Sequence, residues 1–194
     1  MPRISIVSIL KSKDIPAIVI VSAMLAILGN IALAAQDKYT VQVPGGLSFF
    51  EFKGYEEWQV ISMSHSEKML AVIVGNPTMI DAYKSGIPGN GQPFPDGAKM
   101  AKIHWTPTTM EDAPGQPTVP GILHDVDFMV KDSKRFPDSG GWGWAAFNYD
   151  AGSDTFTPAT EADQPPQAND AKCGFACHTI VQAKDYVFTA YPKR

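Results

Sequence analysis

Two cysteines and a histidine lie within six residues near the C-terminal end, and these side chains are the ones best suited to chemistry. The stretch is Cys173-Gly174-Phe175-Ala176-Cys177-His178, and the chain has no other cysteine. In the usual haem-attachment signature C-x-x-C-H, two thiols bond the porphyrin and the adjacent histidine becomes an axial iron ligand. We therefore predict one covalent haem c per chain, attached through Cys173 and Cys177, with His178 as the metal ligand.

The spacing of the two cysteines leaves alternatives open. Three residues separate them instead of two, and Gly174 supplies the backbone freedom that a longer loop needs. A disulfide closing a very small loop, or two free thiols, would use the same residues without a cofactor. A zinc site is disfavoured, because two cysteines and one histidine leave a tetrahedral site one ligand short.

The N-terminal residues predict export from the cytoplasm. Three basic residues precede a mostly apolar run over residues 15–35, which ends in Ala32-Leu33-Ala34. This pattern is typical of a signal peptide, and we expect residues 1–34 to be removed. An uncleaved anchor is the alternative, because the run is almost long enough to span a bilayer. In a bacterium both readings place residues 35–194 in the periplasm, where haem c is attached.

Length, composition and charge limit the class of protein. Residues 35–194 suit one domain with a single core. The formal net charge of the chain is -4, and no basic run interrupts the sequence, which argues against a nucleic-acid partner. Sixteen glycines and sixteen prolines, scattered in turns, predict short elements joined by many loops.

The elements that must position the candidate residues are mostly short strands. Asn76-Pro77 begins the clearest helix, which ends before Gly86. We expect connections over residues 86–97, 106–121 and 150–172. Strands are predicted over residues 41–43, 49–52, 55–65 (or the end of a helix), 69–74, 98–105, 122–130, 140–147 and 185–191. The predicted fold class is α+β, a predominantly antiparallel β-sheet with a few short helices, and not a helix bundle.

Alternation along two of these strands gathers polar residues on single faces. In residues 98–105, Met100, Lys102 and His104 share one face. In residues 122–130, Asp125 and Asp127 share the face that carries fewer apolar residues. Each has an ordinary interpretation as well, because exposed lysines and carboxylates are common on strands and most methionines fill cores. Phe128, Trp142 and Trp144 suit the wall of a haem pocket and equally any sheet core.

Five segments of the chain resemble one protein family in the same order. They are GYEEWQVIS from Gly54, FPDGAKMAKIHW from Phe94, FMVKDSKRF from Phe128, GGWGWAAF from Gly140 and CGFACHTIVQAKDYVFTAY from Cys173. Together they resemble the cytochrome P-460 proteins, periplasmic single-haem cytochromes built on a β-sheet, and the related c-prime-beta cytochromes. The resemblance covers most of residues 35–194.

The resemblance implies a site and two activities. It implies a homodimer whose haem is held by two thioethers and a proximal histidine, with the other iron face open to small ligands. Enzymatic members also bond a lysine to the porphyrin and oxidise hydroxylamine, passing electrons to a periplasmic acceptor cytochrome. Members without that bond bind gases such as nitric oxide or transfer electrons. The D-G-x-x-x-x-K pattern falls on Asp96, Gly97 and Lys102, which makes Lys102 the candidate for the crosslink.

Further roles follow if such a haem is present. A carboxylate such as Asp127 could act as the general base that takes protons from a bound substrate. Met100, on the Lys102 face, is the best candidate for a sixth iron ligand of an electron-transfer cytochrome.

Overall fold

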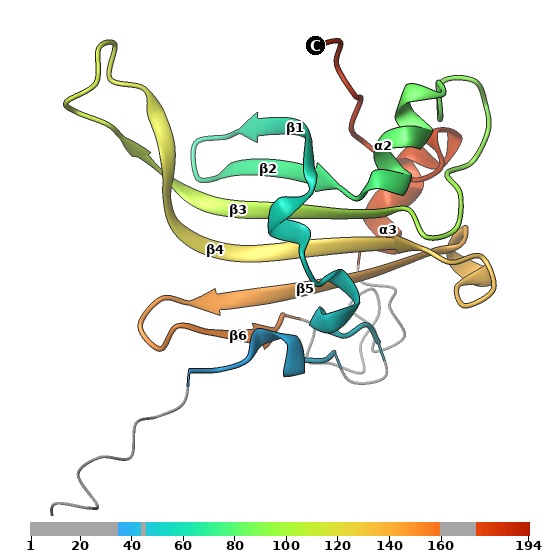
Figure 1. Ribbon diagram of the computed structural model, residues 1–194, viewed down its shortest axis with the longest axis horizontal. Coiled ribbons are helices and arrows are strands. Elements are labelled where there is room, and N and C mark those ends of the chain that lie inside the picture. Colours follow the sequence, from blue (N-terminus) through green and yellow to red (C-terminus); the bar gives the residue numbers. More distant parts are fainter. Residues whose placement is uncertain (1–34, 44–45, 160–173) are drawn as a thin grey trace, which may run out of the picture. The chain divides into compact units, whose positions relative to one another are not determined.

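Six strands form one antiparallel sheet, and each strand pairs with its neighbours in the sequence, in the order β1-β2-β3-β4-β5-β6 (Figure 1). The strands are β1 (Gln59–His65), β2 (Leu70–Gly75), β3 (Lys99–Thr109), β4 (Thr118–Lys131), β5 (Trp142–Asp150) and β6 (Thr155–Pro158). This computed structural model describes residues 35–43, 46–159 and 174–194. The predicted signal peptide, Cys173 and most of the predicted connection over residues 150–172 lie outside the described residues.

Short helices accompany the sheet. The α-helices among the described residues are α2 (Pro77–Lys84) and α3 (Phe175–His178). The 3-10 helices are η1 (Lys38–Thr40), η2 (Phe49–Phe52), η3 (Tyr55–Glu57), η4 (Pro137–Ser139) and η5 (Thr179–Lys184). The predicted α+β class, dominated by an antiparallel sheet, is therefore confirmed. Within the described part of the chain, no helix is both long and apolar enough to cross a membrane.

One face of the sheet is covered by the N-terminal turns η1, η2 and η3. Phe49 contacts three rings of this face edge-on or tilted, and its nearest ring centroid is that of Phe147, at 4.8 Å. Phe52 stacks on Phe128 with ring centroids 4.1 Å apart. Aromatic pairs at such distances add to the stabilisation that burial provides. This aromatic cluster fixes the sheet from one side and leaves the other side for the site.

The opposite face is covered by α2 and by the C-terminal segment, residues 174–194. Helix α2 begins as predicted, because the Asn76 side chain accepts a hydrogen bond from the Met79 amide at 3.0 Å. Its buried residues are Met79, Ile80, Ala82 and Tyr83. The Tyr83 hydroxyl donates to the Thr189 carbonyl at 3.0 Å and so ties the helix to the C-terminal segment.

Three predicted strands are wrong. Residues 41–43 contribute only an isolated bridge between Gln42 and Ser48 and form no strand of the sheet. Residues 49–52 form the 3-10 helix η2, and the Glu51 carboxylate accepts from the Ser48 amide at 3.1 Å, which closes its first turn. Residues 185–191 alternate in sequence but do not pair with the sheet. Asp185 and Tyr186 both have positive φ, 50° and 64°, and this left-handed backbone is incompatible with an extended strand.

Two predicted connections contain sheet. The connection over residues 106–121 is largely the far end of the β3–β4 hairpin, which pairs as far as Thr109 with Thr118. Its Pro-rich composition favoured a loop, but the two prolines Pro107 and Pro120 face each other in the ladder of this hairpin. The start of the connection over residues 150–172 contains β6, which pairs with β5.

Candidate functional site

A cavity of about 420 Å³ lies on the α2 face of the sheet, between the strands and the C-terminal segment. Its lining from the strands is Ser62, Ser64, Ile73, Met100, Lys102, Asp127, Phe128, Met129, Trp144 and Ala145. Its lining from the C-terminal segment is Gly174, His178, Val187, Phe188 and Thr189. A concave site with a mostly apolar wall and a few convergent polar groups is typical of a cofactor or ligand pocket.

His178 enters the cavity from the last position of α3. Its Nδ1 lies 2.6 Å from the Tyr186 carbonyl oxygen. A carbonyl can only accept, so Nδ1 carries the proton and donates, which leaves the lone pair of neutral imidazole on Nε2. Burial lowers the pKa of His178, although the hydrogen bond to Tyr186 opposes this effect. A neutral histidine with its second nitrogen held by a carbonyl is the arrangement that metal-ligating histidines adopt.

Aromatic rings surround the imidazole. The Trp144 ring centroid lies 5.5 Å from that of His178, and the Phe188 ring centroid lies 4.9 Å away. Gly174 is in the left-handed region at φ 84°, and a Cβ there would come within 3.1 Å of Trp144. The glycine expected to give this loop its freedom therefore does so, and it lets the chain pass close to the indole.

Of the two candidate haem-bonding thiols, Cys177 is described and exposed, one residue before His178. Cys173 lies in the part of the chain that the structure does not describe. The geometry of the pair therefore stays a prediction, as do the disulfide and free-thiol alternatives.

Lys102 and Asp127 face each other across the β3–β4 ladder, and both line the cavity. Directly paired residues of antiparallel strands project from the same face. The shared faces predicted from alternation thus meet in one polar pair beside the pocket that holds His178. The positive charge of Lys102 acts on both neighbours, since it contributes to lowering the pKa of His178 and that of Asp127.

The environment of Asp127 raises its pKa to about 6, mainly through burial and secondly through the negative charge of Asp125. The side chain is nevertheless 50% exposed, and part of that exposed surface faces the cavity. A carboxyl group of this kind can hold or release a proton near neutral pH.

A small polar network continues from Asp127 along the strands. His104 donates from Nδ1 to Asp125, and His124 donates to the other oxygen of the same carboxylate at 2.6 Å. Burial alone would raise the pKa of Asp125, but these two hydrogen bonds hold it below its usual value. The ligand atoms of His104, Asp125 and Asp127 lie within 4.8 Å of one another. None of His104, His124 and Asp125 lines the cavity, so this network lies beside the pocket.

The structure distributes the residues considered for a pocket wall between the cavity and the core of the protein. Met100 and Trp144 line the cavity, whereas Trp142 is buried in the neighbouring core. Phe128 borders the cavity, but its ring stacks on the opposite face of the sheet. The wall formed by Val187, Phe188 and Thr189 was missed, because residues 185–191 were interpreted as a strand. Ser62 and Ser64 were recognisable from the alternation of β1 but carried no chemical signal.

The residues present fit a haem. The cavity volume lies within the range of cofactor sites, and His178 offers Nε2 as a ligand for iron. The indole Nε1 atoms of Trp142 and Trp144 are both buried without a hydrogen-bond partner among the described residues, and of the two only Trp144 lines the cavity. Buried donors are normally paired, so an acceptor on a bound group, such as a porphyrin carboxylate, is the kind of partner it lacks.

Comparison with known proteins supports this interpretation. No curated protein matches the sequence. The sequence profile of the Cytochrome P460 family matches residues 52–189, which include all six strands completely, both halves of the cavity lining and His178. This match spans well over half of the chain, so the protein belongs to the cytochrome P460 family of haem-binding cytochromes.

Proposed function

We propose that this protein is a periplasmic c-type cytochrome that oxidises hydroxylamine, or a related small nitrogen compound, at the open face of its haem. The observation that carries the proposal is the cavity itself, because Lys102 and Asp127 from the sheet line the same space as His178 from the C-terminal segment. A ligand for the iron, a lysine able to bond the porphyrin and a base with a pKa of about 6 therefore share one site.

Each of these residues has a separate task. His178 would hold the iron through Nε2, and thioethers from Cys173 and Cys177 would fix the porphyrin edge. When bound, the haem supplies an iron that accepts the electrons of the substrate. Every N–H or O–H bond that hydroxylamine loses also releases a proton, and the Asp127 carboxylate is placed to accept it at near-neutral pH. The apolar wall, including Ile73 and Met129, keeps bulk water away from the reacting atoms.

The alternative function is a non-catalytic haem protein that binds nitric oxide or transfers electrons. One observation favours it: Met100 lines the cavity, and a thioether there could occupy the sixth position on the iron. Lys102 would then be an ordinary cavity lysine. The two functions differ in whether Lys102 is bonded to the porphyrin and in whether hydroxylamine is turned over.

The remaining expectations complete the proposal. Export by the N-terminal segment would place the protein in the periplasm, and the electrons would pass to an acceptor cytochrome there. A homodimer is proposed on the family resemblance.

The experiment is an absorption spectrum and an intact mass of protein exported together with a c-type haem maturation system. We expect the wild type to carry the mass of one covalent haem and an absorption spectrum unlike that of an ordinary c-type cytochrome. Lys102→Ala should restore the ordinary spectrum and abolish sustained hydroxylamine oxidation. Lys68→Ala, an exposed lysine in the β1–β2 turn, is the matched control and should change neither.

The outcomes separate the functions. An ordinary c-type spectrum that Lys102→Ala leaves unchanged would exclude the crosslinked enzyme and leave the gas-binding or electron-transfer protein. A mass lower than that of the reduced chain by two hydrogens, with no haem, would indicate a Cys173–Cys177 disulfide and exclude both.

A further inference from the structure

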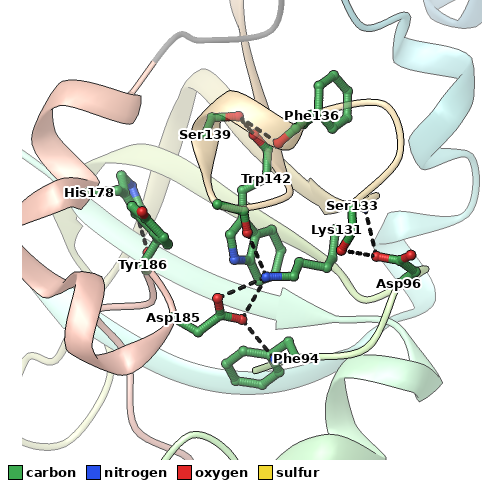
Figure 2. Close-up of polar contacts among 11 residues, drawn as sticks. Phe94, Asp96, Lys131, Ser133, Phe136, Ser139, Trp142, His178, Asp185 and Tyr186 are labelled. Carbon is green, nitrogen blue, oxygen red and sulfur yellow. Dashed lines mark hydrogen bonds and ion pairs between the residues drawn. The ribbon is translucent and has the colours of Figure 1, made fainter. Parts of the chain in front are cut away.

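Lys131 is a lysine in an unusual position, since only 4% of its side chain is exposed. It is the last residue of β4, and its ammonium group donates to the Gly140 carbonyl at 2.8 Å. It also donates to both carboxylate oxygens of Asp185, at 2.8 and 2.9 Å (Figure 2). The ammonium lies 5.1 Å from the centre of the Trp142 ring. The buried charge is thus fully paired, as buried charges must be.

The Asp185 carboxylate is also hydrogen-bonded by more than one donor. Besides Lys131, Asp185 accepts a hydrogen bond from the Phe94 amide at 2.7 Å. The pair therefore joins three parts of the chain, namely the end of β4, the loop before β3 and the C-terminal segment (Figure 2). Replacing a buried ion pair by apolar residues is often neutral or stabilising, whereas removing one partner is strongly destabilising. Stability alone therefore does not account for this pair, and its geometry suggests a second effect.

That effect lies in the backbone next to Asp185. Asp185 and Tyr186 are consecutive non-glycine residues in the left-handed region. Such residues are disfavoured, and they persist where the surrounding contacts determine the conformation. The ion pair holds Asp185 from one side. From the other side the Tyr186 ring lies against Gly140, where a Cβ would come within 2.1 Å of the ring.

The carbonyl of Tyr186 is the group that accepts the hydrogen bond from His178 Nδ1. An extended backbone at residues 185 and 186 would turn this carbonyl elsewhere. The conformation that the ion pair maintains is therefore the one that fixes the ring and the tautomer of the imidazole (Figure 2). The same conformation is the reason why residues 185–191 are not a strand.

We propose that Lys131 and Asp185 are positioning residues for His178, because their buried ion pair holds the left-handed turn whose Tyr186 carbonyl fixes the imidazole with Nε2 directed to the cofactor. The role of the pair toward iron rests on the proposed haem function. Partners of this kind raise the basicity of a metal-bound histidine, and their loss typically costs about 10- to 100-fold in metal affinity or activity. Neither residue lines the cavity, so both act through His178.

The test uses three variants of the exported, haem-loaded protein. Lys131→Met leaves Asp185 buried with the Phe94 amide as its remaining partner. Asp185→Asn removes the negative charge but keeps a residue type that tolerates the left-handed region. The double variant Lys131→Met/Asp185→Asn removes both charges, so it should recover much of the thermal stability that each single variant loses. Lys134→Met, an exposed lysine three residues along, is the matched control.

The informative measurements are the iron–histidine stretching frequency of the ferrous protein and its reduction potential. A histidine that loses its carbonyl partner is a weaker donor, so the frequency should fall and the potential should rise in all three variants. The key expectation concerns the double variant, in which the melting temperature recovers while both spectroscopic signatures stay altered. The control should match the wild type in every measurement.

Two results would overturn the proposal. One is a double variant whose iron–histidine frequency and potential equal those of the wild type, since the pair would then only stabilise the fold. The other is measured if the wild type carries no haem, a finding that would refute the proposed function but not the positioning role. In that case ¹⁵N NMR of His178 compares the haem-free wild type with the variants. An Nδ1–H tautomer that persists unchanged in the double variant would contradict the positioning role.

Discussion

The raised pKa of Asp127 has two opposite consequences: it makes the carboxylate a better base, and it lowers the stability of the folded protein. Its pKa of about 6 lies well above that of an ordinary aspartate, mainly because of burial. The folded protein therefore holds this proton more tightly than the unfolded chain does. By linkage, Asp127 costs stability as the pH rises from about 4 through about 6. The same shift brings the group into the pH range in which a general base is most effective.

Asp127→Asn should consequently lower activity and raise stability. We expect hydroxylamine turnover to fall by about 10²- to 10⁴-fold, the usual contribution of a general base. In the wild type, turnover should rise with pH through about 6, because only the ionised carboxylate accepts protons. The unfolding free energy of the variant at pH 7 should rise by no more than about 1 kcal/mol, because solvent screens a half-exposed group. Steady-state rates and urea unfolding between pH 4 and 8 measure both effects.

Asp112→Asn provides the control for this substitution. Asp112 is exposed in the β3–β4 turn, far along the hairpin from the cavity, and its replacement should leave the pH profile and the stability unchanged. A wild-type rate that does not vary between pH 5 and 7 would rule out Asp127 as the base.

The positions of single residues show which parts of the candidate site could be predicted from the sequence. Alternation placed Lys102 with His104 and Asp125 with Asp127, and the β3–β4 register brings the two pairs together. The motif around His178 indicated a candidate metal ligand, whereas the partner of its Nδ1 could not be predicted. That partner depends on two left-handed residues in a stretch whose apolar alternation is typical of a strand.

Among the elements, α2 links one edge of the site to the start of β3. Asn76 accepts hydrogen bonds from the Met79 and Lys99 amides, both at 3.0 Å. Its amide group also donates to the Gly97 carbonyl at 2.8 Å. The N-cap that the sequence predicted thus has a second task that the sequence did not reveal, since it anchors the strand that carries Lys102.

Asn76→Ala should lower the unfolding free energy by about 2 kcal/mol, about 1 for the lost cap and about 1 for the lost contacts to β3. Asn76→Asp keeps the accepting oxygen and should lose less than half of that amount. Urea unfolding followed by circular dichroism measures the difference. Lys84→Ala, at the exposed end of the same helix, should change stability by less than about 0.5 kcal/mol. Equal midpoints for Asn76→Ala and Asn76→Asp would show that the cap does not act through its oxygen.

Strand lengths explain the other differences between expectation and structure. Proline and glycine in residues 106–121 favoured a connection, because neither residue supports the middle of a sheet. Among the described residues, no third strand pairs with the far part of the β3–β4 hairpin, since β2 pairs with β3 only as far as Trp105 and β5 pairs with β4 only from Asp125 onward. A two-stranded extension can accommodate proline where a central strand cannot, which is why composition alone misassigned it.

In the protein as a whole, the sheet separates two layers with different tasks. The aromatic cluster beneath η2 and η3 stabilises one face, while the other face holds the cavity between α2 and the C-terminal segment. The match to the family profile from residue 52 to residue 189 includes the cavity lining from both the sheet and the C-terminal segment. The fold class was predictable from short strands and turn residues, whereas the cavity needed the tertiary path of residues 174–194.

The proposed homodimer leads to a prediction about the free end of the β3–β4 hairpin, which reaches past the β1–β2 hairpin in Figure 1. Ile122 and Met110 lie there with 63% and 45% of their surface exposed, and apolar side chains exposed on the same hairpin could be buried by a partner. If the two copies meet through these hairpins, burying each Ile122 contributes about 1.5 kcal/mol or more. Because a two-fold interface contains Ile122 from both copies, Ile122→Lys should weaken the dimer by at least about 100-fold.

Light scattering across a dilution series measures this change. The control is Ile180→Lys, which alters an even more exposed isoleucine on η5. Dissociation caused by Ile180→Lys, with Ile122→Lys still dimeric, would place the interface beside α3 and not on the hairpin.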